Sequence, residues 1–216
     1  MMEEIPTEDR HPWFESADDA VRPDTAVLQS LAHPLRIRLL GLLRLHGPST
    51  ATKLATQVNE SSGLTSYHLR HLASAGLVTD AEPDDLAGIR QTGGRERWWK
   101  AVHRFTAVPD APAGDEAAAA VRDDYVRTAL AHYSGTAQRW LAAAHTWPQE
   151  WRSTAGFSDL SLQLTPAESI RLQGEIAELV GRYRRHEPGS TVEPDQAVVT
   201  AQFLVFPHPD QEPPAG

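Results

Sequence analysis

The chain has 216 residues, no cysteine and a formal net charge of −9. The length is ample for a buried core in one large or two small domains, and the lack of cysteine excludes disulfide frameworks and thiolate chemistry. No segment approaches the roughly 18 apolar residues of a membrane span and the N-terminus has no apolar signal core, so we expect a cytoplasmic protein.

The charges are unevenly distributed along the chain. Residues 31–104 carry 10 Lys or Arg and 6 Asp or Glu, a net charge of +4, whereas the remaining residues carry 10 basic and 23 acidic side chains, a net charge of −13. A basic module on an acidic chain directs the attraction for phosphate to one part of the surface. The change of sign coincides with the module that the motifs below predict.

Residues 1–24 are predicted to form a flexible acidic tail, because acidic, proline-containing chain ends are seldom ordered unless something ties them down. The alternative is that Trp13 and Phe14 pack onto the body of the protein.

Two helices are predicted after the tail. Asp24 is placed to cap a short helix over residues 25–32. A longer helix over residues 34–46 begins with Pro34, whose missing amide is not needed there, and ends at Gly47, which tolerates the left-handed conformation. The apolar stripe of this longer helix is expected to lie in the core.

The stretch 47–78 has the pattern of a helix-turn-helix, with two short apolar-periodic segments joined by a polar turn. In each segment, apolar side chains recur at helical spacing and can share one buried face. The residues expected to face inward are Leu54, Ala55 and Val58 in the first segment and Thr65, Leu69, Leu72 and Ala73 in the second.

The opposite face of the second helix is small, hydroxyl-bearing and basic, which suits a DNA major groove. Serine hydroxyls bond to phosphate or base, an arginine fork pairs with guanine, and the free amides of a helix N-terminus favour phosphate. The competing interpretation is an ordinary solvated surface helix. The candidate DNA-binding residues of this segment are Ser61, Ser62, Ser66, Tyr67 and Arg70.

A hairpin wing is predicted to follow. Residues 77–79 are strand-like, and the run 93–102 begins with two glycines and continues with aromatic residues, as the returning arm of a hairpin does. One of the two adjacent tryptophans is expected to seal the core and the other to meet the long helix described below. Arg90, Arg95 and Arg97 are expected to contact the DNA backbone or minor groove.

Across residues 25–105 the sequence resembles the ArsR/SmtB family of winged-helix repressors. The resemblance rests on three patches in the correct order and spacing, residues 31–40, 64–78 and 94–99. It implies a homodimer that binds a partly palindromic operator and represses transcription until an effector binds.

Metal sensing, the best-known activity of this family, is not expected here. The family's thiolate site needs cysteines, and the spacing of Asp123, Asp124, His132 and His145 does not match its Asp, His and Glu site on the dimer helix. His68 and His71 are close enough on a helix to share an ion, but a metal there would obstruct DNA. We therefore expect no metal and no cofactor, and an effector that is not a metal.

After a linker, residues 115–144 are predicted to form one long helix. Apolar and aromatic side chains recur along it at three- and four-residue steps. Dimerisation through this stripe is preferred over a helix that packs only within its own chain. The expected dimer-interface residues are Val121, Tyr125, Ala129, Tyr133, Ala137 and Trp140.

The C-terminal part is predicted to be a strand-helix-strand appendage over residues 158–206. Leu160, Leu162 and Leu164 alternate with polar residues, as in a half-buried strand, and 197–206 is a second expected strand. Between them, Thr165 to Glu168 supply a helix capping box.

The predicted fold class is thus α+β, with three parts. A tail (1–24) precedes a winged-helix DNA-binding domain (25–106), and a dimerisation and effector domain (107–216) follows. An apolar effector pocket at the helix–sheet junction is one hypothesis, and plain core packing is the default. The residues considered for the pocket are Tyr133, Trp140, Trp147 and Trp151.

Enzymatic activity is not expected, because the chain has no Gly-Lys phosphate loop, no His-Glu-x-x-His and no Gly-x-Ser-x-Gly. The sequence instead predicts a homodimeric DNA-binding regulator, a repressor released by an effector. The alternative is a winged-helix scaffold that binds an acidic protein and lacks specific DNA binding.

Overall fold

The computed structural model describes residues 20–87, 89, 96–106, 108, 110–183 and 185–212. These residues divide into two compact units. The first unit contains residues 20–135 and 185–197, and the second contains residues 136–183 and 198–212. Most of the predicted tail, and Arg90 and Arg95 of the predicted wing, lie outside the described residues.

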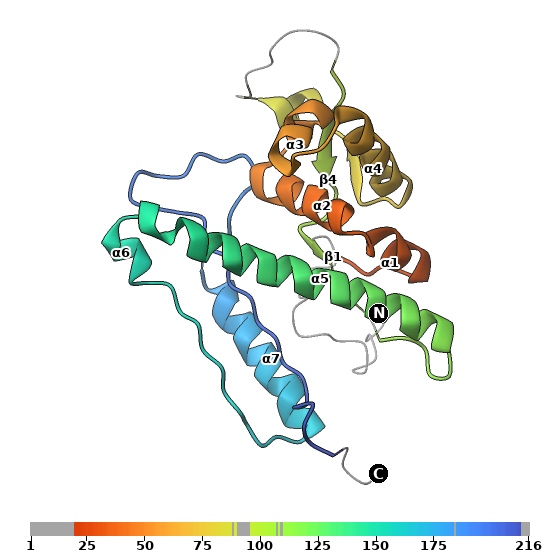
Figure 1. Ribbon diagram of the computed structural model, residues 1–216, viewed down its shortest axis with the longest axis vertical. Coiled ribbons are helices and arrows are strands. Elements are labelled where there is room, and N and C mark those ends of the chain that lie inside the picture. The colour runs from red at the N-terminus through yellow and green to blue at the C-terminus, as the bar shows by residue number, and fades with distance from the viewer. Residues whose placement is uncertain are drawn as a thin grey trace, which may run out of the picture. The chain divides into compact units, whose positions relative to one another are not determined.

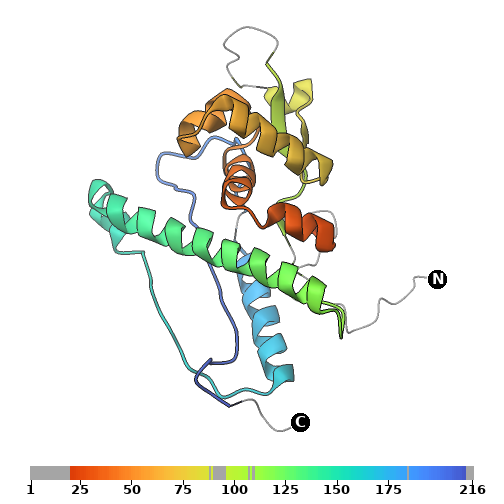
Figure 2. The same ribbon diagram turned by 45° about the vertical axis from the view of Figure 1, so that its right-hand side comes forward.

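The first unit consists of short helices on a small sheet, and a long helix begins in it (Figures 1 and 2). Its helices and strands, in chain order, are β1 (Ala20–Val21), α1 (Thr25–Leu31), α2 (Pro34–His46), β2 (Ser49–Thr50), α3 (Ala51–Val58), α4 (Ser62–Ser74), β3 (Val78–Asp80), η2 (Pro83–Leu86, a 3-10 turn), β4 (Trp98–Ala101), β5 (Phe105–Thr106) and the start of α5 (Glu116–Ala143).

Local capping explains where the first helices begin and end. The Val27 amide donates to the Asp24 carboxylate over 2.8 Å, so Asp24 caps α1 as predicted. Helix α2 spans the predicted residues and stops at Gly47, whose φ of 78° a residue with a Cβ rarely adopts. These helix positions were therefore predictable from single residues at the helix ends.

The wing hairpin is present as an antiparallel pair, with Val78 opposite Ala101 and Asp80 opposite Trp99. A third strand, β2, adds to the other side of β4 and gives the strand order β2-β4-β3. A second, two-residue parallel pair joins β1 to β5. Neither β1 nor β2 was predicted, because two-residue strands leave no periodic pattern in a sequence.

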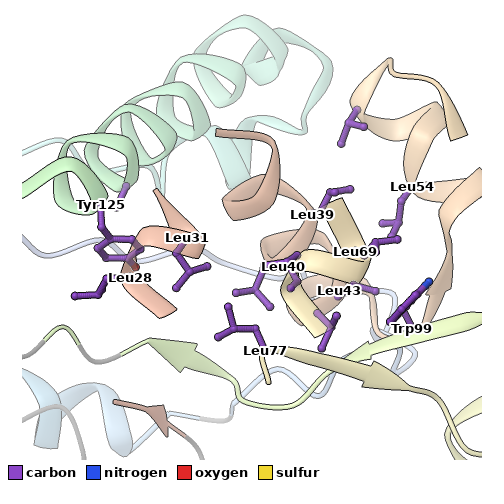
Figure 3. Close-up of a cluster of buried hydrophobic side chains, with 14 residues drawn as sticks. Leu28, Leu31, Leu39, Leu40, Leu43, Leu54, Leu69, Leu77, Trp99 and Tyr125 are labelled. Carbon is purple, nitrogen blue, oxygen red and sulfur yellow. The ribbon is translucent and has the colours of Figure 1, made fainter. Parts of the chain in front are cut away.

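The core of the first unit lies between α1, α2, α3, α4 and the sheet. Leu39, Leu69 and Leu72 are almost fully buried in it. Tyr125 and Ala129 of α5 belong to the same core, and Figure 3 shows the Tyr125 ring beside Leu28 of α1.

This placement assigns part of the expected dimer stripe to the core of the single chain, and dimerisation through the stripe stays a prediction. Tyr125 and Ala129 are each only 7% exposed within the single chain, and Val121 is partly buried against the same core. This part of the stripe packs in the same core cluster as Leu28 and Leu31 of α1. Of the residues assigned to the interface, Tyr133, Ala137 and Trp140 keep accessible surface.

The segment 185–197 returns to the first unit and lies against the end of α2. Nε2 of His186 is 2.6 Å from the carbonyl oxygen of Leu45, and Glu187 pairs with Arg104 over 2.6 Å. A Cβ on Gly47 would meet the backbone of Pro188 at 3.1 Å, so this approach needs glycine there. The winged helix is thus contacted by a segment about 140 residues further along the chain.

The second unit contains the end of α5, the 3-10 turn η3 (Ala144–Thr146), α6 (Gln149–Arg152) and α7 (Pro166–Gly181). Helix α7 has the predicted capping box, since the Glu168 amide donates to Oγ1 of Thr165 and the Thr165 amide to the Glu168 carboxylate. It ends at Gly181.

The two C-terminal strands were predicted wrongly. Residues 158–165 and 197–206 are irregular, and the side chains of Leu160 and Val199 are 85% and 72% exposed. Alternation of apolar and polar residues identifies a face, but a strand also needs a hydrogen-bonded neighbour, and within the described chain neither segment pairs with another strand. The chain is therefore helical where it is regular beyond residue 115.

Candidate nucleic-acid interface

The exposed face of α4 is the face that the sequence predicted. Thr65, Leu69 and Leu72 are buried, and Ala73 is half-buried beside them. Tyr67, which is 50% exposed, and Arg70 lie at the surface, and Ser66 is partly accessible. The helix therefore presents an aromatic phenol, a guanidinium and a hydroxyl along one face.

The N-terminus of α4 continues this face. The Leu64 amide donates to Oγ of Ser61 over 3.2 Å, so Ser61 caps the helix. Ser62 and Gly63 are exposed, and the space where a Cβ on Gly63 would lie is empty. A polymer backbone can thus approach the free first-turn amides closely, which favours phosphate.

The turn between α3 and α4 is held by an arginine from α2. Nη2 of Arg38 donates to the Gln57 carbonyl over 2.9 Å, and Nη1 donates to the Val58 carbonyl over 3.2 Å. Asn59 follows in the left-handed conformation with a φ of 59°. Arg38 thereby satisfies carbonyls at the end of α3 and holds the angle between the two helices.

The rings of His33, Tyr67, His68 and His71 contact one another along α4. The rings of His33 and His68 lie 4.5 Å apart between centroids, and Tyr67 meets His71 edge-on at 4.6 Å. Burial lowers the pKa of His68, and the neighbouring charges of His33, Arg36 and His71 lower it further. Burial and the Arg36 charge also lower the pKa of His33. Both imidazoles are thus favoured in their neutral form.

Arg97 of the wing has an ion-pair partner that the sequence did not reveal, and its contact with DNA stays a prediction. Its guanidinium forms a two-point pair with the Asp80 carboxylate, at 2.5 and 3.1 Å, and lies 3.9 Å from the centre of the Trp99 ring. The pKa of Asp80 is lowered, chiefly by the hydrogen bond from Arg97. A phosphate must therefore compete with Asp80 for Arg97.

The two tryptophans of β4 have different surroundings. Trp99 seals the core as predicted. The Lys53 ammonium of α3 lies 4.2 Å above the ring of Trp98, and its expected contact with the long helix stays a prediction. The strand thus links α3 to the sheet through a cation–π contact.

The residues of the hypothetical pocket fall in different units. Trp140, Trp147 and Trp151 form an edge-to-face row, with centroid distances of 5.5 and 6.3 Å. Tyr133 belongs to the first unit. The structure brings the three tryptophans together within the second unit.

Three arginines of α2 have roles that the sequence did not reveal. Arg38 holds the turn, Arg36 lies beside the histidine cluster, and Arg44 is bonded to the β4–β5 corner. Helical spacing showed only that they avoid the apolar stripe. The hydrogen-bond partners of Arg38 and Arg44 come from distant parts of the chain, so no local signal could have identified them.

The comparison with known protein families agrees with this geometry. Residues 31–81 match the family model of a helix-turn-helix domain. The chain contains a helix-turn-helix domain. This match supports a DNA-binding regulator, and it spans α2, α3 and α4. The comparison with curated proteins found no match.

Two further features of the described residues bear on function. None of their helices has the length and apolar content needed to cross a membrane. They also contain no group of three or more His, Asp or Glu side chains positioned to hold a metal ion.

Proposed function

We propose that this protein is a sequence-specific transcriptional regulator of the ArsR/SmtB type, a homodimeric repressor released by an organic effector. The observation that carries the proposal is the exposed face of α4, where Ser66, Tyr67 and Arg70 stand on a helix whose other face is buried. An arginine on such a helix can pair bidentately with guanine in the major groove, while hydroxyls and the helix N-terminus contact phosphates.

Dimerisation is proposed through the part of the α5 stripe that keeps accessible surface. Tyr133 is 39% exposed, and Leu130 and Leu141 on the same helix are 42% and 60% exposed. Exposed apolar side chains of this size on a long helix favour packing against the same helix of a second copy of the chain. Two-fold symmetry would set two α4 helices about 34 Å apart, the repeat of the DNA duplex.

The test is a selection of bound duplexes from genomic fragments at two salt concentrations, with the molar mass of the protein and complex measured by light scattering. A partly palindromic motif, a dimer and a steep salt dependence are expected, because each phosphate contact releases counterions. Reporter transcription from the selected sites would then show repression. Weak binding without a preferred sequence would overturn the proposal and favour a scaffold for an acidic protein.

A further inference from the structure

Arg44 is a mostly buried cation whose bonding partners are neutral. Its Nε donates to the His103 carbonyl over 2.8 Å and its Nη2 donates to Oγ1 of Thr106 over 3.1 Å. Among the described residues no carboxylate forms an ion pair with it. Burial lowers the pKa of Arg44 to about 10, which leaves the guanidinium charged at neutral pH.

The nearby phenol of Tyr125 does not supply the missing negative charge. Tyr125 lies close enough to affect Arg44, but burial raises the pKa of its phenol to about 12. Tyr125 is therefore neutral under ordinary conditions. A buried cation without an anionic partner is costly, and chains usually retain one for a reason other than stability.

Arg44 lines an open cavity of about 340 Å³ within the first unit. The walls come from the end of α2, from β4 and its connection to β5, from η2, and from the returning segment at Pro188. Lys100, His103 and Arg104 add three more basic side chains, whereas Val102 and Pro188 add apolar surface.

Carboxylates already occupy two of these basic groups. Asp85 pairs with Lys100 over 2.6 Å and Glu187 pairs with Arg104 over 2.6 Å. His103 has a buried Nδ1 without a hydrogen-bond partner in the described chain. The cavity thus contains cationic groups that bind carboxylates in this geometry, one cation without a carboxylate, and one unsatisfied polar atom.

We propose that this cavity binds a small organic carboxylate, which is the effector of the regulator. The acid bonds to Arg44 and competes with Asp85 for Lys100, while its apolar body lies against Val102 and Pro188. The effector role rests on the proposed DNA-binding function, but binding of the acid does not.

The position of the cavity explains how an acid acts on DNA binding. Asp85 lies in η2, just after strand β3, and Lys100 lies in β4, so their ion pair connects the two arms of the wing. An acid that displaces Asp85 from Lys100 loosens the base of the wing. It thereby lowers the affinity for DNA without touching α4.

The binding test uses the full chain without DNA. Thermal unfolding is measured with a panel of small carboxylates such as benzoate and phenylacetate, each beside its neutral alcohol or amide, and with inorganic phosphate. A bound acid should raise the melting temperature by roughly 5 °C at about 100 times its Kd, and the neutral partners should not. If no acid in the panel stabilises the protein, or if inorganic phosphate does so as well as the acids, the proposal is overturned.

Three variants locate the site by calorimetric titration of the strongest acid. Lys100→Met should weaken binding roughly 10- to 100-fold through loss of a charged hydrogen bond. Asp85→Asn should strengthen binding, because it removes the competing charge and keeps an acceptor for the Glu82 amide, which now donates to Asp85 over 2.7 Å. Arg127→Gln, on the exposed side of α5, is the control and should change nothing. If all three variants bound the acid with equal affinity, the acid would bind outside this cavity.

The effector role has its own readout. DNA affinity is measured by fluorescence anisotropy with and without the acid, and sodium chloride keeps the ionic strength equal because DNA binding is salt-sensitive. The acid should weaken binding for the wild type and less for Lys100→Met. An acid that binds in the cavity and leaves DNA affinity unchanged would overturn the effector role alone. A protein that binds the acid but no DNA would instead refute the proposed function.

Discussion

The rings of His33 and His68 lie 4.5 Å apart between centroids with a tilt of 42°, and this contact joins the start of α2 to the middle of α4. His33 has a second role, because its Nδ1 accepts the Leu35 amide over 3.1 Å and caps α2. That nitrogen must be unprotonated to accept. The contact that supports α4 thus depends on two neutral imidazoles.

Stability should therefore fall in mild acid. The pKa values of His33 and His68 are both below the ordinary 6.5, so below that pH the unfolded chain binds more protons than the folded one. The free energy of unfolding should decrease as pH falls from 6.5 toward the folded pKa values. Urea titrations between about pH 5 and 8 measure this, since histidine titrates there.

The matched variants for this experiment are His68→Gln and His145→Gln. The first removes a buried imidazole and should flatten the pH dependence, whereas His145 is exposed and its variant should follow the wild type. If the free energy of unfolding of His68→Gln changed with pH as steeply as that of the wild type, other groups would cause the acid sensitivity.

Arg70 should provide base specificity. Arg70→Ala should weaken binding to the preferred duplex by about 1–3 kcal/mol and relax the preference at one base pair, because it removes a bidentate contact. Competition binding against specific and random duplexes measures both effects. The control is Arg127→Ala on α5. Equal losses on both duplexes would show instead that Arg70 contacts the DNA backbone.

Asp80 should limit the affinity for DNA by holding Arg97 in an ion pair. Asp80→Asn removes the charge that holds Arg97, so affinity should rise on every duplex. The salt slope should steepen by about 0.9 if Arg97 gains one phosphate. Asp123→Asn, an equal charge change on an exposed residue of α5, controls for net charge. If both variants bind DNA alike, Arg97 makes no contact of its own.

Tyr125 should stabilise the single chain. Tyr125→Ala leaves a cavity beside Leu28 and should lower the free energy of unfolding by about 3–5 kcal/mol, as for other buried aromatic residues. Tyr183→Ala, at a residue that is 71% exposed, should have little effect. If Tyr125 contacted a second copy instead, its contribution would vary with protein concentration.

The sequence predicted the helix-turn-helix well because helical periodicity and end caps are local. Leu69 and Arg70 are adjacent in the chain, yet their spacing relative to other apolar residues assigned one to the core and the other to the surface. The wing hairpin was predicted for a similar reason, since its aromatic arm and its glycines are close in sequence.

The wrong strand prediction and the contacts that the sequence did not reveal all involve residues that are distant in the chain. The leucines at 160–164 alternate as a strand does, but alternation does not supply a neighbouring strand. The sequence did not reveal the ion pair of Arg97, because Asp80 is 17 residues away across the hairpin; a contact of Arg97 with DNA stays a prediction. The burial of Tyr125 likewise required α1, almost 100 residues earlier.

The return of residues 185–197 to the winged helix has a consequence for dissecting the protein. The described chain passes between the two units three times, at residues 135, 184 and 197. A protease cut near residue 135 leaves the fragments joined through His186 and Glu187, whose partners Leu45 and Arg104 belong to the other fragment. The nicked protein should therefore elute as one particle, and truncation at residue 135 would remove Pro188, which lines the cavity beside Arg44, together with the second unit.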